Sequence, residues 1–203
     1  MALKAVVFDV GETLVDEERW WRRLADHAEL QPHVVWAALG VTIERGEEHT
    51  ALWDHLGVGA PPAWSEIPYS LDDLYPDAWD CLERVRAVGY RVGIVGNQTE
   101  VLEAWARESA LPADLVSSSA SLGVRKPDPM FFAKVCELVG HSPGDVAYVG
   151  DRVDNDVLPA AAAGLIAVHV RRGPWGRLQA TPPEAAISLD DLASLPEALA
   201  SLA

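Results

Sequence analysis

Short apolar runs alternate with helical patterns along most of this chain, and this alternation constrains the fold more than any other feature. Five runs rich in β-branched residues have the length and composition of strands: 5–9, 91–95, 114–118, 146–150 and 166–170. Apolar residues at helical spacing separate most of these runs, which is typical of βαβ units around a buried parallel sheet. The pattern therefore predicts an α/β fold with a parallel sheet.

The alternation of strand-like and helical patterns stops between residues 16 and 75, where no clear strand occurs. Three stretches of this segment have the apolar spacing of amphipathic helices: 17–30, 33–45 and 47–56. We predict a Rossmann-like core domain over residues 1–15 and 76–203, with a small α-helical cap over residues 16–75 inserted into it. The cap holds five of the eight tryptophans, which form either its core or an aromatic wall over a ligand: Trp20, Trp21, Trp36, Trp53 and Trp64.

Composition limits the partners that this protein can bind. The chain has 203 residues, of which 49% are hydrophobic, so it is long enough to bury a core. Its formal net charge of -15 disfavours nucleic acid and anionic membranes, because few cations are available to neutralise phosphates. No apolar stretch reaches membrane-spanning length, so we expect a cytoplasmic protein that acts on a small molecule.

Polar residues follow three of the predicted strands. Asp9, the Gly96-Asn97 pair and Asp151 each stand at the carboxyl end of a run. In an open parallel sheet these ends share one edge, where ligands bind, so the side chains should converge. Lys126 lies in a loop stiffened by two prolines and can supply a cation to the same edge. We therefore predict a site that combines a nucleophilic carboxylate, a lysine and a second carboxylate.

Three segments carry a resemblance to a known family. Residues 6–14 read Val-Val-Phe-Asp-Val-Gly-Glu-Thr-Leu, residues 123–129 read Gly-Val-Arg-Lys-Pro-Asp-Pro, and residues 149–156 contain Gly-Asp followed by Asn-Asp. In this order they resemble the haloacid dehalogenase (HAD) superfamily of hydrolases, one subgroup of which carries a helical cap after the first motif.

The resemblance implies a role for each motif residue. Asp9 would be the nucleophile that forms an aspartyl-phosphate, and Lys126 would neutralise the phosphate oxygens. The implied Mg²⁺ ligands are Asp9, Asp151 and the backbone carbonyl of Gly11, an all-oxygen set that suits this ion. The remaining implied residues would bind the phosphate or support the ligands from behind: Gly96 and Asn97 for the phosphate, and Asn155 and Asp156 for support.

Two positions depart from the family pattern. Gly96 replaces a Ser or Thr that often binds phosphate, and Gly11 replaces the Asp that protonates the leaving oxygen and activates water. Such acid-base help is worth ~10²–10⁴-fold in rate, so Gly11→Asp is expected to restore it. Glu12 is one candidate substitute, although a shift of one residue should turn its side chain elsewhere. Weaker candidates lie further along the chain: Asp16, Asp26 and His27.

The sequence favours one function and leaves two others open. We expect a Mg²⁺-dependent phosphatase that acts on a small phosphate ester or acyl phosphate. A protein with little or no turnover that binds Mg²⁺ and an anionic ligand or a protein partner is the alternative. A 2-haloacid dehalogenase is a third possibility, because a halide leaving group needs no proton. Residues 171–176 follow the last strong strand and are expected to form an exposed turn or a substrate-contacting loop.

Overall fold

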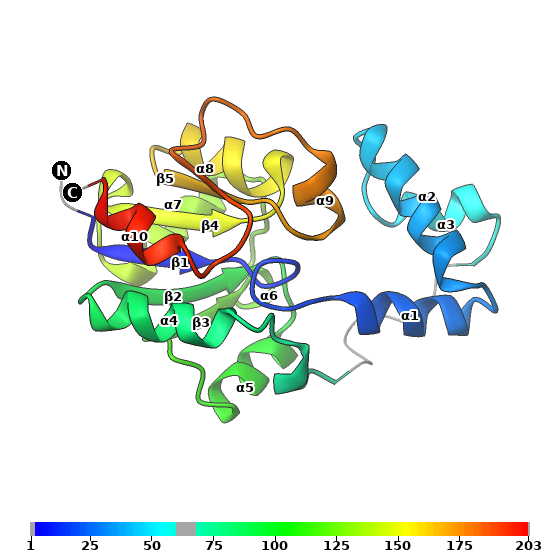
Figure 1. Cartoon of the computed structure of the whole chain (residues 1–203), viewed down its shortest axis with the longest axis horizontal. Coiled ribbons are helices and arrows are strands. Elements are labelled where there is room, and N and C mark those ends of the chain that lie inside the picture. Colours follow the sequence, from blue (N-terminus) through cyan, green and yellow to red (C-terminus); the bar gives the residue numbers. More distant parts are fainter. Residues whose placement is uncertain (1–2, 60–67, 203) are drawn as a thin grey trace.

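The computed structural model describes residues 3–59 and 68–202. Within these residues, six strands form one sheet in the order β3-β2-β1-β4-β5-β6, and every neighbouring pair is parallel (Figure 1). The strands span β1 Ala5–Phe8, β2 Arg91–Gly96, β3 Leu115–Ser118, β4 Val146–Gly150, β5 Ile166–Val170 and β6 Ile187–Leu189. The α/β class and the parallel sheet predicted from the apolar runs are confirmed.

Helices connect the strands and cover both faces of the sheet. The α-helices are α1 Glu18–His27, α2 Pro32–Glu44, α3 Ala51–Leu56, α4 Ala78–Ala87, α5 Glu100–Glu108, α6 Ser119–Leu122, α7 Pro129–Val139, α8 Leu158–Ala162, α9 Gly173–Leu178 and α10 Leu195–Ala200. Shorter turns are η2 Leu71–Asp73 and η3 Pro143–Asp145, which are 3₁₀-helical, and η4 Val153–Val157, which is π-helical. None of the described helices is both long and apolar enough to cross a membrane.

Alternating side chains of the strands build two hydrophobic layers. On β1, Val6 and Phe8 pack with residues of α4, α5 and α10, whereas Ala5 and Val7 pack with residues of α7 and α8. This is the period-2 pattern of a strand that is buried on both faces. The core is therefore a three-layer α/β/α arrangement with β1 near its centre.

The register places the carboxyl ends of the central strands side by side. Phe8 pairs with Ile94 on one side and Val149 on the other, so the residues that follow β1, β2 and β4 meet at one edge. The amide N–H of Asp9 extends this ladder by donating to the Val149 carbonyl at 2.8 Å. The strand ends thus deliver their polar residues to a single place, as the sequence predicted.

Helices α1, α2 and α3 stand apart from the sheet, at the right in Figure 1. Trp21, Leu39 and Trp53 belong to a separate buried cluster there, and Trp175 of α9 joins the same cluster. Trp20 instead packs in the core of the sheet, and Trp64 lies outside the described residues. The small helical unit therefore uses its large aromatic side chains mainly as a core.

The two crossings between the sheet and these helices run next to each other. Val15 forms an antiparallel bridge with Leu74, and the Asp16 N–H donates to the Asp73 carbonyl at 2.8 Å. Arg19 of α1 holds the buried Asp73 carboxylate with two hydrogen bonds, at 2.5 and 2.6 Å. Division of the chain at residues 15/16 and 75/76 stays a prediction, although these contacts mark the crossings clearly.

Two local expectations differ from the structure. Residues 173–176 of the turn or loop expected at 171–176 belong to helix α9, because Pro174 fits its first turn and the buried Trp175 fixes it against the helical unit. The helix expected from residue 156 is α8, which begins two residues later, after the π-helical turn η4. Insertions of this kind in a helix are common at functional sites.

Candidate active site

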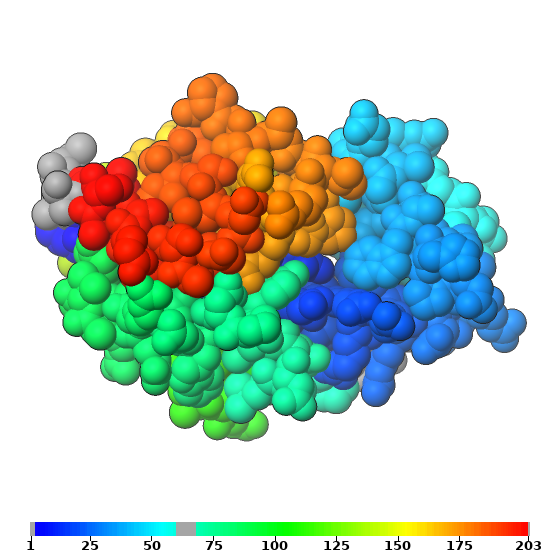
Figure 2. Space-filling view, in the orientation of Figure 1, coloured from blue at the N-terminus to red at the C-terminus, as the bar shows by residue number. Residues whose placement is uncertain are grey.

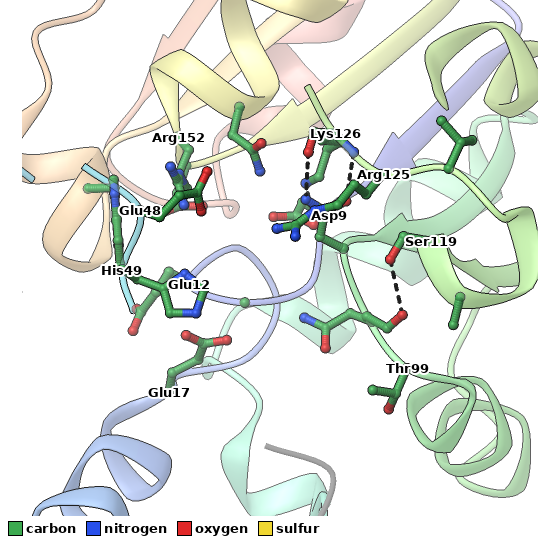
Figure 3. A pocket seen from close by; sticks show the side chains of 18 of the residues that line it. Asp9, Glu12, Glu17, Glu48, His49, Thr99, Ser119, Arg125, Lys126 and Arg152 are labelled. Atoms are coloured by element: carbon green, nitrogen blue, oxygen red, sulfur yellow. Dashed lines mark hydrogen bonds and ion pairs between the residues drawn. The ribbon is translucent and has the colours of Figure 1, made fainter. Parts of the chain in front are cut away.

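A cavity of about 600 Å³ opens at the carboxyl end of the sheet, between the core and helices α1–α3 (Figures 2 and 3). Residues from both sides line it. The core contributes Asp9, Gly11, Asn97, Lys126, Asp151 and Asn155, among others, and the helical unit contributes Trp21, Glu48 and His49. Of the predicted site residues, Gly96 and Asp156 lie directly behind this lining. The structure therefore brings together the side chains that the three sequence segments supply.

Lys126 links two of the predicted carboxylates. Its Nζ atom lies 2.7 Å from Asp9 Oδ1 and 2.5 Å from Asp156 Oδ1. The side chains of Lys126 and Asp156 are each only 1% exposed, so protein groups must replace water around them. Burial alone would lower the pKa of Lys126, but the Asp156 and Asp9 carboxylates outweigh it and raise this pKa well above its usual value. Lys126 therefore stays a cation beside Asp9.

Asn97 holds the Lys126 loop in place. Its Nδ2 donates to the Lys126 carbonyl at 3.0 Å, and its Oδ1 accepts from the Lys126 N–H at 2.8 Å. This pair of bonds fixes the backbone of Lys126 against the end of β2. Asn97 also lines the cavity, and one of its amide hydrogens is left for a ligand, so its predicted role in binding phosphate stays a prediction.

Asp9, Asp151 and Asp156 form an acidic group at the carboxyl end of the sheet, which is named the acidic edge. One oxygen from each of Asp9, Asp151 and Asp156 can be chosen so that all three lie within 4.8 Å of one another. The Asp156 Oδ2 accepts the Arg152 N–H at 3.0 Å, so η4 aims this carboxylate at the lysine. His169, which the sequence did not single out, supports the edge from β5, with its Nε2 3.0 Å from the Asp151 carbonyl.

These carboxylates carry more negative charge than Lys126 balances. Burial, followed by the Asp156 and Asp9 charges, raises the pKa of Asp151 well above its usual value. Burial likewise raises the pKa of Asp156 to about 6, although Lys126 opposes the rise. A divalent cation bound by the carboxylate oxygens would supply the missing positive charge, so the donor set fits Mg²⁺.

A carboxylate of another residue occupies the space beside Gly11 and the space beside Gly96. A Cβ atom built on Gly11 would stand 2.2 Å from Glu17 Oε1, and one built on Gly96 would stand 2.3 Å from Asp9 Oδ1. Neither glycine therefore leaves an empty space. The place beside residue 11, where the resemblance implied a missing side chain, is filled by Glu17 from the start of α1.

Glu17 was not identified from the sequence. It lines the cavity, and Figure 3 shows its carboxyl group near the loop that follows Asp9. Burial, followed by the charges of Glu12 and Asp9, raises the pKa of Glu17 well above its usual value. No local sequence pattern marks this residue, because its position depends on the direction in which the chain leaves the sheet.

Glu12 was expected to point away from the site, and this expectation is wrong. Its backbone has a positive φ of 53°, which turns the chain so that its side chain lines the cavity. Tyr75 Oη donates to Glu12 Oε2 at 2.5 Å, and burial raises the pKa of Glu12 to about 7. Arg172 stacks over the Tyr75 ring at 4.3 Å and is paired with Asp77, so a chain of contacts fixes this glutamate.

The weaker acid candidates do not reach the cavity. The Asp16 carboxylate accepts the Glu18 N–H at 2.8 Å, and Asp26 and His27 lie on the exposed side of α1. The wall of the cavity next to the helical unit contains Arg152, whose guanidinium lies 4.8 Å from the centre of the Trp175 ring. Together with Trp21, this wall gives the cavity an aromatic and cationic side.

The sheet order and the site at its carboxyl edge define a Rossmann-like α/β protein with a carboxylate–lysine centre. A family model for haloacid dehalogenase-like hydrolases matches residues 3–164. Because the match covers most of the chain, this protein belongs to the haloacid dehalogenase-like hydrolase family.

Individual relatives include phosphatases and dehalogenases. A glyceraldehyde 3-phosphate phosphatase from Methanopyrus kandleri is 29% identical over 201 residues, covering 85% of this chain and 86% of the relative. The HAD-hydrolase YfnB from Bacillus subtilis, solved bound to magnesium, is 20% identical with a TM-score of 0.73, covering 98% and 99%. The L-2-haloacid dehalogenase of Xanthobacter autotrophicus is 21% identical with a TM-score of 0.70, covering 99% and 100%. At these identities the two structures support the fold alone.

Proposed function

We propose that this hydrolase is a Mg²⁺-dependent phosphatase that cleaves a small phosphate ester or acyl phosphate through an aspartyl-phosphate on Asp9. The observation that carries the proposal is the lysine bridge: Lys126 Nζ contacts Asp9 at 2.7 Å and Asp156 at 2.5 Å inside a buried acidic edge. Likeness to a phosphatase over 85% of this chain supports the same chemistry.

Each residue of the site would have a separate role in the reaction. Asp9, ionised beside Lys126, attacks phosphorus, and Lys126 balances the charge that the phosphate oxygens bring into the cavity. Asp156 and Asn97 hold Lys126 from two directions. Mg²⁺ would be held by Asp9, Asp151 and the Gly11 carbonyl, with Asn155 and Asp156 as supports. When bound, this ion adds electrostatic stabilisation of the transferring phosphoryl group.

The two other functions have weaker support. A non-catalytic binding protein was suggested by Gly11 and Gly96, but carboxylates occupy the space beside both glycines. A dehalogenase would not need a metal site, whereas Asp151 and Asp156 form with Asp9 an acidic group that could hold a metal ion for phosphoryl transfer. Both functions remain outcomes of the test below.

Labelling with acetyl [³²P]phosphate in the presence of Mg²⁺ tests the proposal. We expect label that hydroxylamine releases, as for an acyl phosphate, in the parent protein and in a surface control, Asp145→Asn. Asp9→Asn and the parent with excess chelator should stay unlabelled. An equally labelled Asp9→Asn variant would remove Asp9 as the nucleophile. An unlabelled parent that releases halide from 2-haloacids would favour the dehalogenase.

A further inference from the structure

Hydrolysis of a phosphate ester requires a group that can exchange protons beside the nucleophile. The departing oxygen takes both electrons of the broken P–O bond, and an alkoxide is a poor leaving group unless it is protonated. Lys126 is held by two carboxylates, and Asp9 must remain an anion to attack. The donor must therefore be found among the other groups that line the cavity.

Glu12 and Glu17 are two carboxyl groups that line the cavity and are not paired with Lys126. Glu12 is committed to other contacts, because it accepts the Tyr75 hydroxyl at 2.5 Å and packs against Gly173. A Cβ on Gly173 would lie 2.6 Å from Glu12 Oε2 and 2.7 Å from its Cγ. The turn and α9 thus enclose this side chain and hold it to one side.

Glu17 is placed differently. Its Oε1 lies 2.2 Å, and its Cδ 2.8 Å, from the position of a Cβ on Gly11, two residues beyond Asp9. In the described part of the chain, its carboxylate takes part in no hydrogen bond or ion pair, although it lines the cavity. Figure 3 shows it approaching from α1, on the opposite side of the cavity from Lys126.

We propose that Glu17 is the general acid and base of the phosphatase reaction, acting from the helical unit in the space that Gly11 leaves open. This role rests on the proposed function of Asp9. When an Asp9 oxygen bonds to phosphorus, the ester P–O bond breaks, and the leaving oxygen keeps the electron pair and takes the Glu17 carboxyl proton. Water then attacks the aspartyl-phosphate and gives a proton to Glu17, while the P–O bond to Asp9 breaks. Inorganic phosphate leaves, and both side chains return to their starting forms.

Glu17→Gln tests this role because it keeps the side-chain shape and removes the exchangeable carboxyl proton. The probes are two esters with Mg²⁺: 4-nitrophenyl phosphate, whose leaving group departs as a stable anion, and glycerol phosphate, whose leaving group needs a proton. We expect kcat/KM for glycerol phosphate, which reports formation of the aspartyl-phosphate, to fall by ~10²–10⁴-fold and kcat/KM for nitrophenyl phosphate to fall far less. Glu18→Gln, which alters the neighbouring exposed glutamate, should leave both rates unchanged.

A double variant distinguishes catalysis from structural support. Gly11→Asp alone should bring little gain, because the new side chain and Glu17 would occupy the same space. In a Glu17→Ala background that space is free, so Gly11→Asp should recover much of the lost glycerol phosphate activity. Thermal unfolding and calorimetric Mg²⁺ binding of each variant show that the fold and the acidic edge persist.

The outcomes separate this role from the phosphatase function itself. A ratio of the two kcat/KM values that is the same in Glu17→Gln as in the parent would overturn the role of Glu17 and leave Asp9 as nucleophile. A ratio that changes without rescue by Gly11→Asp in the Glu17→Ala background would also count against it. A parent that cleaves neither ester and takes no label at Asp9 would refute the phosphatase function and this role together.

Discussion

The two sides of the cavity hold their carboxylates in different ways. On the core side, Asp9 and Asp156 are tied to one buried lysine, and Asp156 also accepts a backbone N–H. On the side of the turn and α1, Glu12 meets a tyrosine hydroxyl, and no cation pairs with Glu17 among the described residues. The core side thus holds Asp9 and Asp156 against a buried cation, whereas the carboxyl groups on the α1 side have no such partner among the described residues.

This difference indicates how the family site can vary. The strand ends place Asp9 and Asp151 through backbone pairing, which leaves little freedom in their positions. The α1 side depends on a turn and a helix start, so a carboxylate can reach the same space from another position in the chain. In this chain the space beside Gly11 is taken by the Glu17 carboxyl group.

The largest expected effect comes from removing the cation on the core side. Lys126→Met leaves Asp9 and Asp156 buried without their partner, so the free energy of unfolding should fall by about 3–5 kcal/mol. Urea unfolding without Mg²⁺ measures this change. Lys4→Met breaks an exposed pair with Asp145 and should cost far less. Equal losses in the two variants would mean that the buried bridge is no more important than a surface pair.

A smaller effect is expected when the space behind the nucleophile is filled. Gly96→Ala puts a Cβ 2.3 Å from Asp9 Oδ1, so the carboxylate must shift or the strand must move. We expect a loss of about 1–3 kcal/mol in stability and up to ~10²-fold in turnover. Gly40→Ala in α2 meets no atom within 4 Å and should stabilise the helix by roughly 0.5–1 kcal/mol. An active, fully stable Gly96→Ala would show that Asp9 can occupy another position.

The contribution of the acidic edge to metal binding should be next in size. Asp151→Asn removes a buried carboxylate that has no lysine partner, so calorimetry should find Mg²⁺ affinity reduced by at least about tenfold. Asp154→Asn is the matched control, because Asp154 pairs with Arg152 and lies outside the acidic group. Similar affinity in Asp151→Asn and Asp154→Asn would place the ion elsewhere.

The core side could be predicted from the sequence because the carboxyl ends of parallel strands meet at one edge of the sheet. Asp9 and Asp151 follow buried apolar runs, and parallel pairing brings such ends together. Lys126 was predicted from its loop and motif, and it reaches the same edge. The sheet, its helices and the acidic edge could therefore be predicted from hydrophobic periodicity, composition and the order of the motifs.

The α1 side could not be predicted in the same way. The location of Glu12 depends on one backbone φ of 53°, which an L-residue adopts only at some cost and which no pattern reveals. Glu17 and Tyr75 meet the site because two crossings lie side by side, a contact between residues that are about 60 positions apart in the chain. Such tertiary contacts leave no local periodicity to detect.

The smallest expected effect concerns the proton held on the α1 side. The Tyr75 hydroxyl lowers the pKa of Glu12, while burial, the larger influence, raises it to about 7. Tyr75→Phe removes the hydroxyl, so the pKa of Glu12 should move further upward, as followed by carbon-13 NMR of its carboxyl group in metal-free protein. The Glu17 N–H and Arg172 still favour the charged form and limit the change.

The sign of the linked stability follows from the direction of this pKa. A carboxyl whose pKa is raised on folding holds its proton longer in the folded state, so its contribution falls as pH rises from 4.5 to about 7. Tyr75→Phe should extend that fall to higher pH, and urea unfolding across this range can detect it. Tyr90→Phe, at the amino end of β2, should leave both curves unchanged. A Glu12 titration unaffected by Tyr75→Phe would mean that the hydroxyl does not hold this carboxylate, and the contrast between the two sides of the cavity would then rest on Glu17 alone.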